Sequence, residues 1–372
     1  MTLRYGDVVD SEDLLADVLP RPRGERSEFL LNELKQAPHT MRSLPPLGDD
    51  PVTGEDTALA LYCIYELSFR GFADVSDGWE WEPSLIANRR ILEKEFEEAL
   101  RERTPDAGQP TPHLALAQLT EMSQGLGGPS LSNYLGVKGS LEQFREFAIH
   151  RSAYQLKEAD AHTWAIPRLG GRAKAALIEI QSDEYGFGRA RDMHQNLFAV
   201  TMSQLGLDPS YGAYIDRIPG TTLATSNLVT MLAQHRRLRG AAIGHLALFE
   251  LCSVLPMSRY VAGLLRLGQS TDAQHFFAAH VIADAHHGRL ALEQMVTYLL
   301  IDEPHLASDV VFGAAALTYV EATFAASLLD DWACGKSSLL PAHVELMTSP
   351  ACGSQSTTST NAAALMHASL GA

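Results

Sequence analysis

The sequence predicts an all-α protein. Apolar residues recur at helical spacing over most of the 372 residues, and no alternating apolar pattern of useful length indicates a strand. Prolines and glycines separate these apolar segments, most clearly Pro209, Pro219, Pro256 and Pro304. The length is sufficient for one large helical domain or two smaller ones.

Residues 1–110 are predicted to form an N-terminal helical extension. It would contain a short helix at 27–36, a buried helix at 55–71 and a charged helix at 84–103, followed by a proline-rich linker at 104–112. The extension carries aromatic side chains that need burial, either against the rest of the chain or in a homodimer interface: Tyr62, Tyr65, Phe69, Phe72, Trp79 and Trp81.

Residues 111–340 are predicted to form a second, larger helical domain. A glycine-rich connection is expected at 125–139. Helices are expected at 113–124, 140–161, 172–185, 189–206, 221–235, 239–255, 257–267, 271–299 and 306–332. Residues 341–372 are small and polar and are expected to be a disordered tail.

Composition restricts the class of partner and the compartment. The net charge of −16 argues against nucleic acid and anionic membranes, because phosphate groups need a basic face. The four cysteines form no metal or redox motif, and the first residues lack the apolar core of a signal peptide. No apolar run of membrane-spanning length is found, so a cytoplasmic protein without a membrane partner is expected.

The segment from His280 to His287 has the pattern H-x3-D-x2-H. On a helix, offsets of four and seven residues return to nearly the same face, so His280, Asp284 and His287 point the same way. The outer pair is about 10 Å apart along the axis, which suits two metals with Asp284 between them. Core histidines, and an arginine paired with Asp284, are the competing interpretations. The adjacent His286 lies about 100° around the helix and is expected at the surface or beside the ligands.

Glu184 and His194 are further ligand candidates. An unbroken helix would separate them by about 15 Å, too far for one metal, but Gly186 and Gly188 between them can break the helix. A solvated carboxylate is the alternative for Glu184, and Asp183 is its competitor as a ligand.

Two glutamates complete the candidate set. Glu250 is a single acid inside an apolar helical run, where a buried carboxylate needs a partner. For Glu158, a charged helix face is an equally good explanation. Four carboxylates and three imidazoles without a thiolate suit iron or manganese, and carboxylate-bridged diiron centres recur in helical cores. The candidate catalytic metal ligands are Glu158, Glu184, His194, Glu250, His280, Asp284 and His287.

At these residues the chain resembles the heme-oxygenase-like diiron oxidase and oxygenase superfamily. Members carry E-x(n)-H, then a glutamate, then H-x3-D-x2-H, in this order. Here Glu184 with His194 matches the first pattern, Glu250 the second and His280–His287 the third. Glu158 matches an additional helix glutamate of the family. The spacing is similar to that of the central N-oxygenase domain of streptozotocin formation. The stretches QLKEAD, EIQSDEYGFG and RLRGAAIGHLALFE are similar to iron-containing redox enzymes, and the resemblance extends over about 20–339. Relatives often have acidic residues where Ile282 and Gly288 stand here.

The resemblance implies a seven-helix, heme-oxygenase-like bundle that binds two Fe(II) ions without heme and uses O2 as co-substrate. It also implies a small-molecule substrate and an external electron donor. The favoured reaction is N-hydroxylation of an amine in a small amino-acid-like substrate. The alternatives are oxidative C–C cleavage or decarboxylation of an amino or fatty acid, an iron-binding or ferroxidase-like protein, and a cofactorless helical scaffold.

Three residues are candidates for substrate contact. Arg259 follows the Glu250 helix closely, and its guanidinium suits a substrate carboxylate, with a structural salt bridge as the alternative. Tyr185 and Tyr260 are candidates for the pocket wall, with core packing as the alternative.

Overall fold

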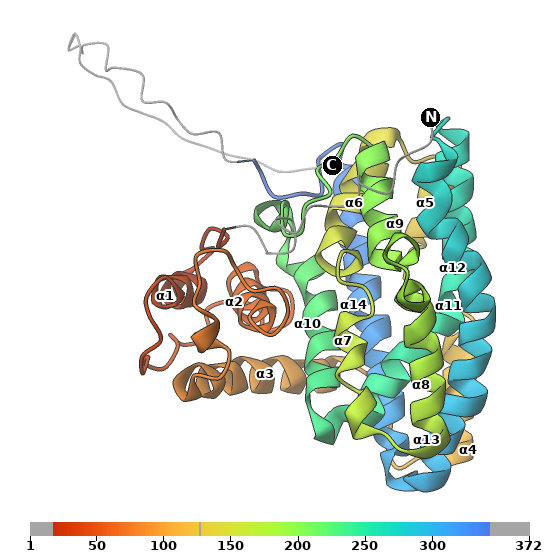
Figure 1. Ribbon diagram of the computed structural model, residues 1–372, viewed down its shortest axis with the longest axis horizontal. Coiled ribbons are helices and arrows are strands. Elements are labelled where there is room, and N and C mark those ends of the chain that lie inside the picture. The colour runs from red at the N-terminus through yellow and green to blue at the C-terminus, as the bar shows by residue number, and fades with distance from the viewer. Residues whose placement is uncertain (1–17, 126–127, 343–372) are drawn as a thin grey trace, which may run out of the picture. The chain divides into compact units, whose positions relative to one another are not determined.

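Every regular element in the described residues is a helix, as Figure 1 shows. The computed structural model describes residues 18–125 and 128–342, and the described residues up to Leu340 form one compact unit. The predicted all-α class is therefore confirmed. The prediction of a disordered tail concerns residues that lie almost entirely outside the described ranges.

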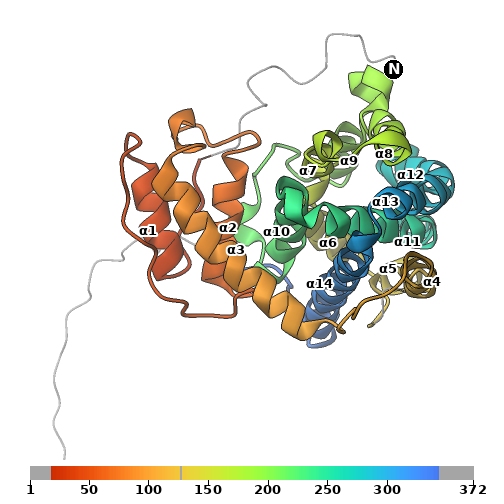
Figure 2. The same ribbon diagram turned by 90° about the horizontal axis from the view of Figure 1, so that it is seen from below.

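A bundle of near-parallel helices forms the larger part of the molecule (Figures 1 and 2). In the described part after residue 140, its α-helices of 11 residues or more are α6 (Leu141–Gln155), α8 (Gly171–Glu184), α9 (His194–Gln204), α10 (Gly220–Gln234), α11 (Arg239–Arg266), α12 (Thr271–Leu290) and α14 (Ala307–Ala333). α4 (Pro112–Met122), which precedes them, is as long as α9. Shorter α-helices lie between and beside them: α5 (Leu131–Val137), α7 (Asp160–Thr163) and α13 (Thr297–Asp302).

Glycines allow the central helix α11 to approach its neighbours closely. A Cβ at Gly244 of α11 would lie 1.9 Å from the carbonyl oxygen of Val310 on α14. A Cβ at Gly288 of α12 would lie 3.1 Å from the carbonyl oxygen of Glu250. The small residue at 288 therefore brings α12 against α11 at the height of Glu250, where an acidic side chain would not fit without movement.

Several boundaries differ from those predicted. The helices predicted at 55–71 and 189–206 are Glu55–Glu66 and His194–Gln204, and three further differences lie in the larger domain. Pro256 lies inside α11 and does not separate two helices, because the packing of α11 against α12 and α14 outweighs the one hydrogen bond that proline removes. The helix predicted at 140–161 ends at Gln155, and Ala159 adopts a left-handed φ of 73° before α7. The glycine-rich connection contains the short helix α5. In each case contacts with other parts of the protein set the boundary. The spacing of apolar residues along one helix does not show such contacts.

The N-terminal helices α1 (Glu25–Leu34), α2 (Glu55–Glu66) and α3 (Pro83–Arg103) lie beside the bundle, with α2 packed on α10 (Figure 2). The Asn227 side chain of α10 donates a buried hydrogen bond of 2.9 Å to the carbonyl oxygen of Ala58. Most of the aromatic side chains of this part are buried within the chain, whereas Trp81 is 71% exposed. Burial therefore needs no second copy, and the homodimer stays a prediction.

Two helical stretches, residues 236–266 and 304–333, are long and apolar enough to cross a membrane by length and composition. Neither is an uninterrupted apolar run, since Glu250 and Arg259 lie within the first and Asp309 and Glu321 within the second. Most of each apolar stretch is buried in the bundle, 67% and 56% respectively, as is typical of core helices in a soluble protein.

Candidate metal centre

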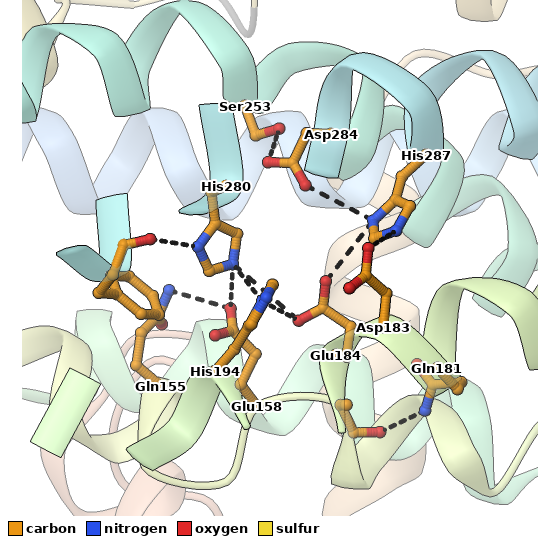
Figure 3. Close-up of polar contacts among 12 residues, drawn as sticks. Gln155, Glu158, Gln181, Asp183, Glu184, His194, Ser253, His280, Asp284 and His287 are labelled. Atoms are coloured by element: carbon orange, nitrogen blue, oxygen red, sulfur yellow. Dashed lines mark hydrogen bonds and ion pairs between the residues drawn. The ribbon is translucent and has the colours of Figure 1, made fainter. Parts of the chain in front are cut away.

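The seven side chains predicted as ligands converge inside the bundle. Figure 3 labels six of them, all except Glu250. They come from the turn after α6, the end of α8, the start of α9, the middle of α11 and one face of α12. Each is at most 7% exposed. The structure thus brings together residues that are up to 129 positions apart (Glu158 and His287).

One group of potential ligand atoms belongs to Glu158, Glu184, His194 and His280, and these atoms lie within 4.8 Å of one another. His194 Nδ1 is 2.6 Å from Glu184 Oε2 and 3.1 Å from His280 Nε2. His280 Nε2 is 3.6 Å from Glu158 Oε1. Two imidazole nitrogens and two carboxylates therefore point at one small volume.

A second group consists of Glu184, Glu250 and His287. His287 Nδ1 is 3.6 Å from Glu184 Oε1 and 3.5 Å from Glu250 Oε2. Asp284 lies beside this group, with Oδ1 3.7 Å from the same nitrogen. Glu184 belongs to both groups, with Oε2 facing the first and Oε1 facing the second, which is the arrangement of a bridging carboxylate.

A tight turn brings Glu184 and His194 together. Gly186, Phe187 and Gly188 all have positive φ values, of 59°, 52° and 78°, and they reverse the chain between α8 and α9. A Cβ at Gly186 would lie 2.5 Å from the backbone carbon of Asp192, so only glycine fits there. The predicted helix break is therefore present, and it places the last residue of α8 against the first of α9.

Hydrogen bonds from outside the seven residues orient them. His280 Nδ1 contacts the carbonyl oxygen of Phe276 at 2.8 Å, which leaves Nε2 facing the cluster. His287 Nε2 contacts Asp183 Oδ2 at 3.1 Å, which leaves Nδ1 facing the cluster. Asp183, considered above as a competing ligand, lies in neither group and has this supporting position instead.

Two further supporting residues were not predicted from the sequence. Ser253 Oγ donates to Asp284 Oδ2 at 2.5 Å, and Gln155 Nε2 donates to Glu158 Oε1 at 3.3 Å. Ser253 lies three residues after Glu250 on the same helix, a spacing that was available as a signal. Gln155 gives no such signal. His286, by contrast, is exposed and contacts Glu179 Oε1 at 2.9 Å, in agreement with a surface position.

Sequence reasoning also missed a buried histidine pair beside the cluster. His162 Nε2 lies 3.5 Å from His245 Nδ1. Burial lowers the pKa of each imidazole to about 3, so both are neutral at physiological pH. His162 borders the same small cavity as Glu158 and Glu184. Each histidine stands alone in the sequence, without a spacing that indicates a site.

The donor set fits bound cations. Four buried atoms of the cluster make no well-oriented hydrogen bond in the described structure: Glu158 Oε2, Glu184 Oε2, Asp284 Oδ1 and His287 Nδ1. The last three have only ion-pair contacts with other members of the cluster. Buried polar atoms are rarely left unsatisfied, because each costs about 1–3 kcal/mol. The four carboxylates carry the formal charge that two divalent cations would offset. The mixture of oxygen and imidazole donors suits iron.

The protonation of the metal-free cluster also indicates that its side chains fit bound cations. Burial, together with Asp284, raises the pKa of Glu250 to about 8. Burial disfavours the charged form of His287, but the neighbouring carboxylates of Asp284 and Glu250 raise the pKa of His287 to about 11. Protons therefore hold the carboxylates together when no metal is bound, and a metal ion would displace them.

The three candidate substrate residues lie in different places. Tyr185 donates to Asp160 Oδ1 at 2.8 Å and does not line a cavity near the cluster. Arg259 and Tyr260 line a cavity of about 530 Å³ that runs along α11. Tyr260 packs on Phe147, with ring centroids 4.7 Å apart. The roles of all three residues in substrate binding stay predictions.

Comparisons with known proteins agree with this geometry. Residues 145–322 match the family described as iron-containing redox enzyme. The chain is also similar to a nitrosourea synthase of Streptomyces achromogenes subsp. streptozoticus, with 29% identity over 132 residues. That similarity covers 35% of this chain and 28% of the relative's length. The predicted resemblance is confirmed for this segment, while the helices before residue 145 lie outside the family match.

Proposed function

Because residues 145–322 match the iron-containing redox enzyme family, we propose that the chain is a non-heme diiron oxygenase or oxidase. Its favoured reaction is N-hydroxylation of an amine in a small amino-acid-like substrate. Glu184 is the observation that carries the proposal, because its two oxygens face two separate groups of ligand atoms. A site for a single metal would not need this arrangement.

Each residue of the cluster has a role in this proposal. Glu158, His194 and His280 would hold one iron, Glu250, Asp284 and His287 the other, with Glu184 shared. Two bound Fe(II) ions would supply the electrons that activate O2. The chain itself contributes the carboxylates that offset the metal charge, histidines fixed in one orientation, and a buried site that excludes water.

The proposed reaction requires a reductant. An amine R–NH2, one O2, two electrons and two protons give R–NHOH and one water. Four electrons reduce O2 fully, and the N–H group being oxidised supplies two of them. An external electron donor must therefore supply the other two in each turnover, and it is a partner in this proposal.

The cavity beside the cluster favours an organic substrate over a ferroxidase. A protein that oxidises only iron needs a polar path to the metals. Here the neighbouring cavity of about 530 Å³ is lined mainly by apolar and aromatic side chains, and its size is within the range of small-molecule sites. Phe249 lines both this cavity and the small cavity at the ligands, so the two adjoin.

The test is an anaerobic Fe(II) titration of metal-free protein, followed by mixing with O2 and candidate amines under a chemical reductant. We expect two equivalents of bound iron, O2 uptake that depends on the amine, and a hydroxylamine product identified by mass. Release of CO2 would instead indicate C–C cleavage, and O2 uptake without an organic substrate would indicate a ferroxidase.

Adjacent histidines provide a matched pair of variants. His287→Ala should lose iron and O2 uptake, because Nδ1 faces the second group of ligands. His286→Ala should retain both, since that side chain is exposed, its polar contact is with Glu179, and its ring lies 6.2 Å from the ring of His287. Equal behaviour of the two variants would contradict the proposed ligand set.

A further inference from the structure

The cavity along α11 has an aromatic interior. Its volume of about 530 Å³ is within the range of about 300–1,000 Å³ that holds small organic ligands. The aromatic side chains that line it come from α6, α9, α11, α12 and α14: Phe147, Phe198, Phe249, Tyr260, Phe276, Phe277 and Phe324. The body of a ligand in this space must be largely apolar, because polar groups there would lose water without gaining partners.

One end of the cavity borders the ligand cluster. Ser253 lines the cavity and donates to Asp284, and Gln155 lines it and donates to Glu158. Phe276 also lines it, and its carbonyl oxygen contacts His280 Nδ1. A molecule that fills the cavity therefore reaches the side chains that hold the proposed iron ligands in place.

The charged residues in the described lining are Arg151, Glu321 and Arg259. Arg151 and Glu321 neutralise each other through two parallel hydrogen bonds of 2.9 Å and 2.6 Å. Arg259 Nη1 contacts the hydroxyl oxygens of Ser130 and Ser132 at 3.2 Å and 3.4 Å. Within the described residues no carboxylate pairs with Arg259, so the lining carries one uncompensated positive charge in a protein of net charge −16.

The helix fixes how far this charge lies from the metal cluster. Arg259 follows Glu250 by nine residues on α11, which is about 13 Å along the axis. An arginine side chain that leans back toward the helix N-terminus covers at most about half of that distance. The guanidinium and the cluster are therefore roughly 7 Å or more apart, with the aromatic lining between them.

We propose that this cavity binds an ω-amino carboxylic acid with an apolar chain or ring between its two ends. Arg259 holds the carboxylate, the aromatic side chains enclose the body, and the amine lies at the Ser253 and Gln155 end. This assignment rests on the proposed amine oxidation and specifies its substrate class. It also places the oxidised end away from the carboxylate, which favours N-hydroxylation over loss of the carboxyl group.

Binding calorimetry on the metal-free protein tests the carboxylate site separately from catalysis. The probes are octanoate and octan-1-ol, which share an apolar body and differ in charge. Octanoate should bind about tenfold more tightly or better, because a charge-assisted hydrogen bond to Arg259 adds to the burial of the chain. Arg259→Met should lower octanoate binding to the level of octan-1-ol and leave octan-1-ol unchanged.

Two controls locate the effect. Arg90→Met removes an exposed arginine from α3, outside the cavity, and should change neither ligand. Ala325→Leu adds volume inside the cavity and should weaken both ligands together. Thermal unfolding and iron content of each variant show whether the fold and the metal cluster are intact.

The outcomes separate this inference from the proposed function. Equal affinity of octanoate and octan-1-ol, or unchanged octanoate binding in Arg259→Met, overturns the carboxylate site even where iron binding and O2 uptake are normal. Specific octanoate binding in a protein that takes up no iron supports the site and counts against the diiron function. With both intact, 8-aminooctanoate should be N-oxygenated, and Arg259→Met should raise its KM far more than it changes kcat.

Discussion

Lys157 and Glu158 are neighbours in the chain, yet they enter two different buried clusters. Lys157 joins what we call the paired cluster, Glu66, Lys157 and Tyr211, in which Lys157 Nζ and the Tyr211 hydroxyl both contact Glu66. The Lys157 ammonium also lies 4.6 Å from the ring centroids of Tyr62 and Phe69. The paired cluster satisfies its charges with protein groups alone.

Glu158 joins the ligand cluster, the seven residues described as the candidate metal centre. Its members are as deeply buried as those of the paired cluster, but four of their polar atoms make no well-oriented hydrogen bond in the described structure. Burial of charge is therefore common to both clusters and does not identify a metal site. A metal site is indicated instead by buried oxygen and nitrogen atoms that face one another without well-oriented hydrogen bonds.

The largest expected difference between the clusters is in iron content. Glu184→Gln removes the charge of the carboxylate shared by both ligand groups, and we expect it to lose at least one of the two iron ions per chain. Glu66→Gln changes a glutamate of the paired cluster in the same way and should leave iron content at the wild-type value. Anaerobic Fe(II) titration with metal analysis measures both, and equal iron loss would remove the distinction between the clusters.

Substitutions in the paired cluster should instead lower the free energy of unfolding. Lys157→Met leaves Glu66 buried without its cation, which typically costs about 3–5 kcal/mol of unfolding free energy. The double variant Lys157→Met/Glu66→Gln removes both charges and should recover more than half of that loss. Urea denaturation of the metal-free proteins measures this, and a double variant as unstable as the sum of the singles would show that the two residues act independently.

The sequence predicted the fold class and which side chains come together inside the bundle, because both depend on patterns that one helix displays; their role as metal ligands stays a prediction. His280, Asp284 and His287 share a helix face by spacing alone, and Glu250 stands out as an acid among apolar residues. Glu184 and His194 needed a chain reversal, for which Gly186 and Gly188 gave a visible signal.

The remaining features depend on contacts between distant segments. The spacing of Ser253 from Glu250 is visible in the sequence, but its contact with Asp284 is not. Gln155 gives no signal at all, and packing decides its contact with Glu158. The charge balance of the cavity likewise requires knowing that Arg151 meets Glu321, 170 positions away. Helical periodicity also failed at Pro256, where α11 continues through a proline and packs on neighbouring helices.

The turn between α8 and α9 offers a sharper test of how the ligand cluster is assembled. Gly186 and Gly188 both have positive φ, but only at Gly186 would a Cβ collide with neighbouring backbone; at Gly188 nothing lies within 4 Å. Gly188→Ala should therefore cost about 1 kcal/mol of stability and keep both iron ions. Gly186→Ala must displace Asp192 and Met193, and with them His194, so it should bind iron more weakly. Iron titration of the two variants tests this, and equal iron affinity would mean that the turn does not position His194.

His150 represents a third kind of buried polar group, neutral and fully hydrogen-bonded, with Thr222 Oγ1 at 2.8 Å and Ser338 Oγ at 3.0 Å. Burial lowers the pKa of His150 to about 3, so the folded state stays unprotonated at pH 5 while the unfolded state gains a proton below about pH 6.5. The folded state therefore loses stability as pH falls, by about 2 kcal/mol from this residue between pH 7.5 and pH 5. His162 and His245 contribute to the same trend, so the loss of stability of the wild-type protein with acid is the sum of several residues.

The His150→Gln variant should lose about 2 kcal/mol less stability than the wild type between pH 7.5 and pH 5, whatever its stability at pH 7.5. Urea denaturation of both metal-free proteins at the two pH values measures this difference, and an unchanged difference would show that His150 does not carry this part of the acid sensitivity.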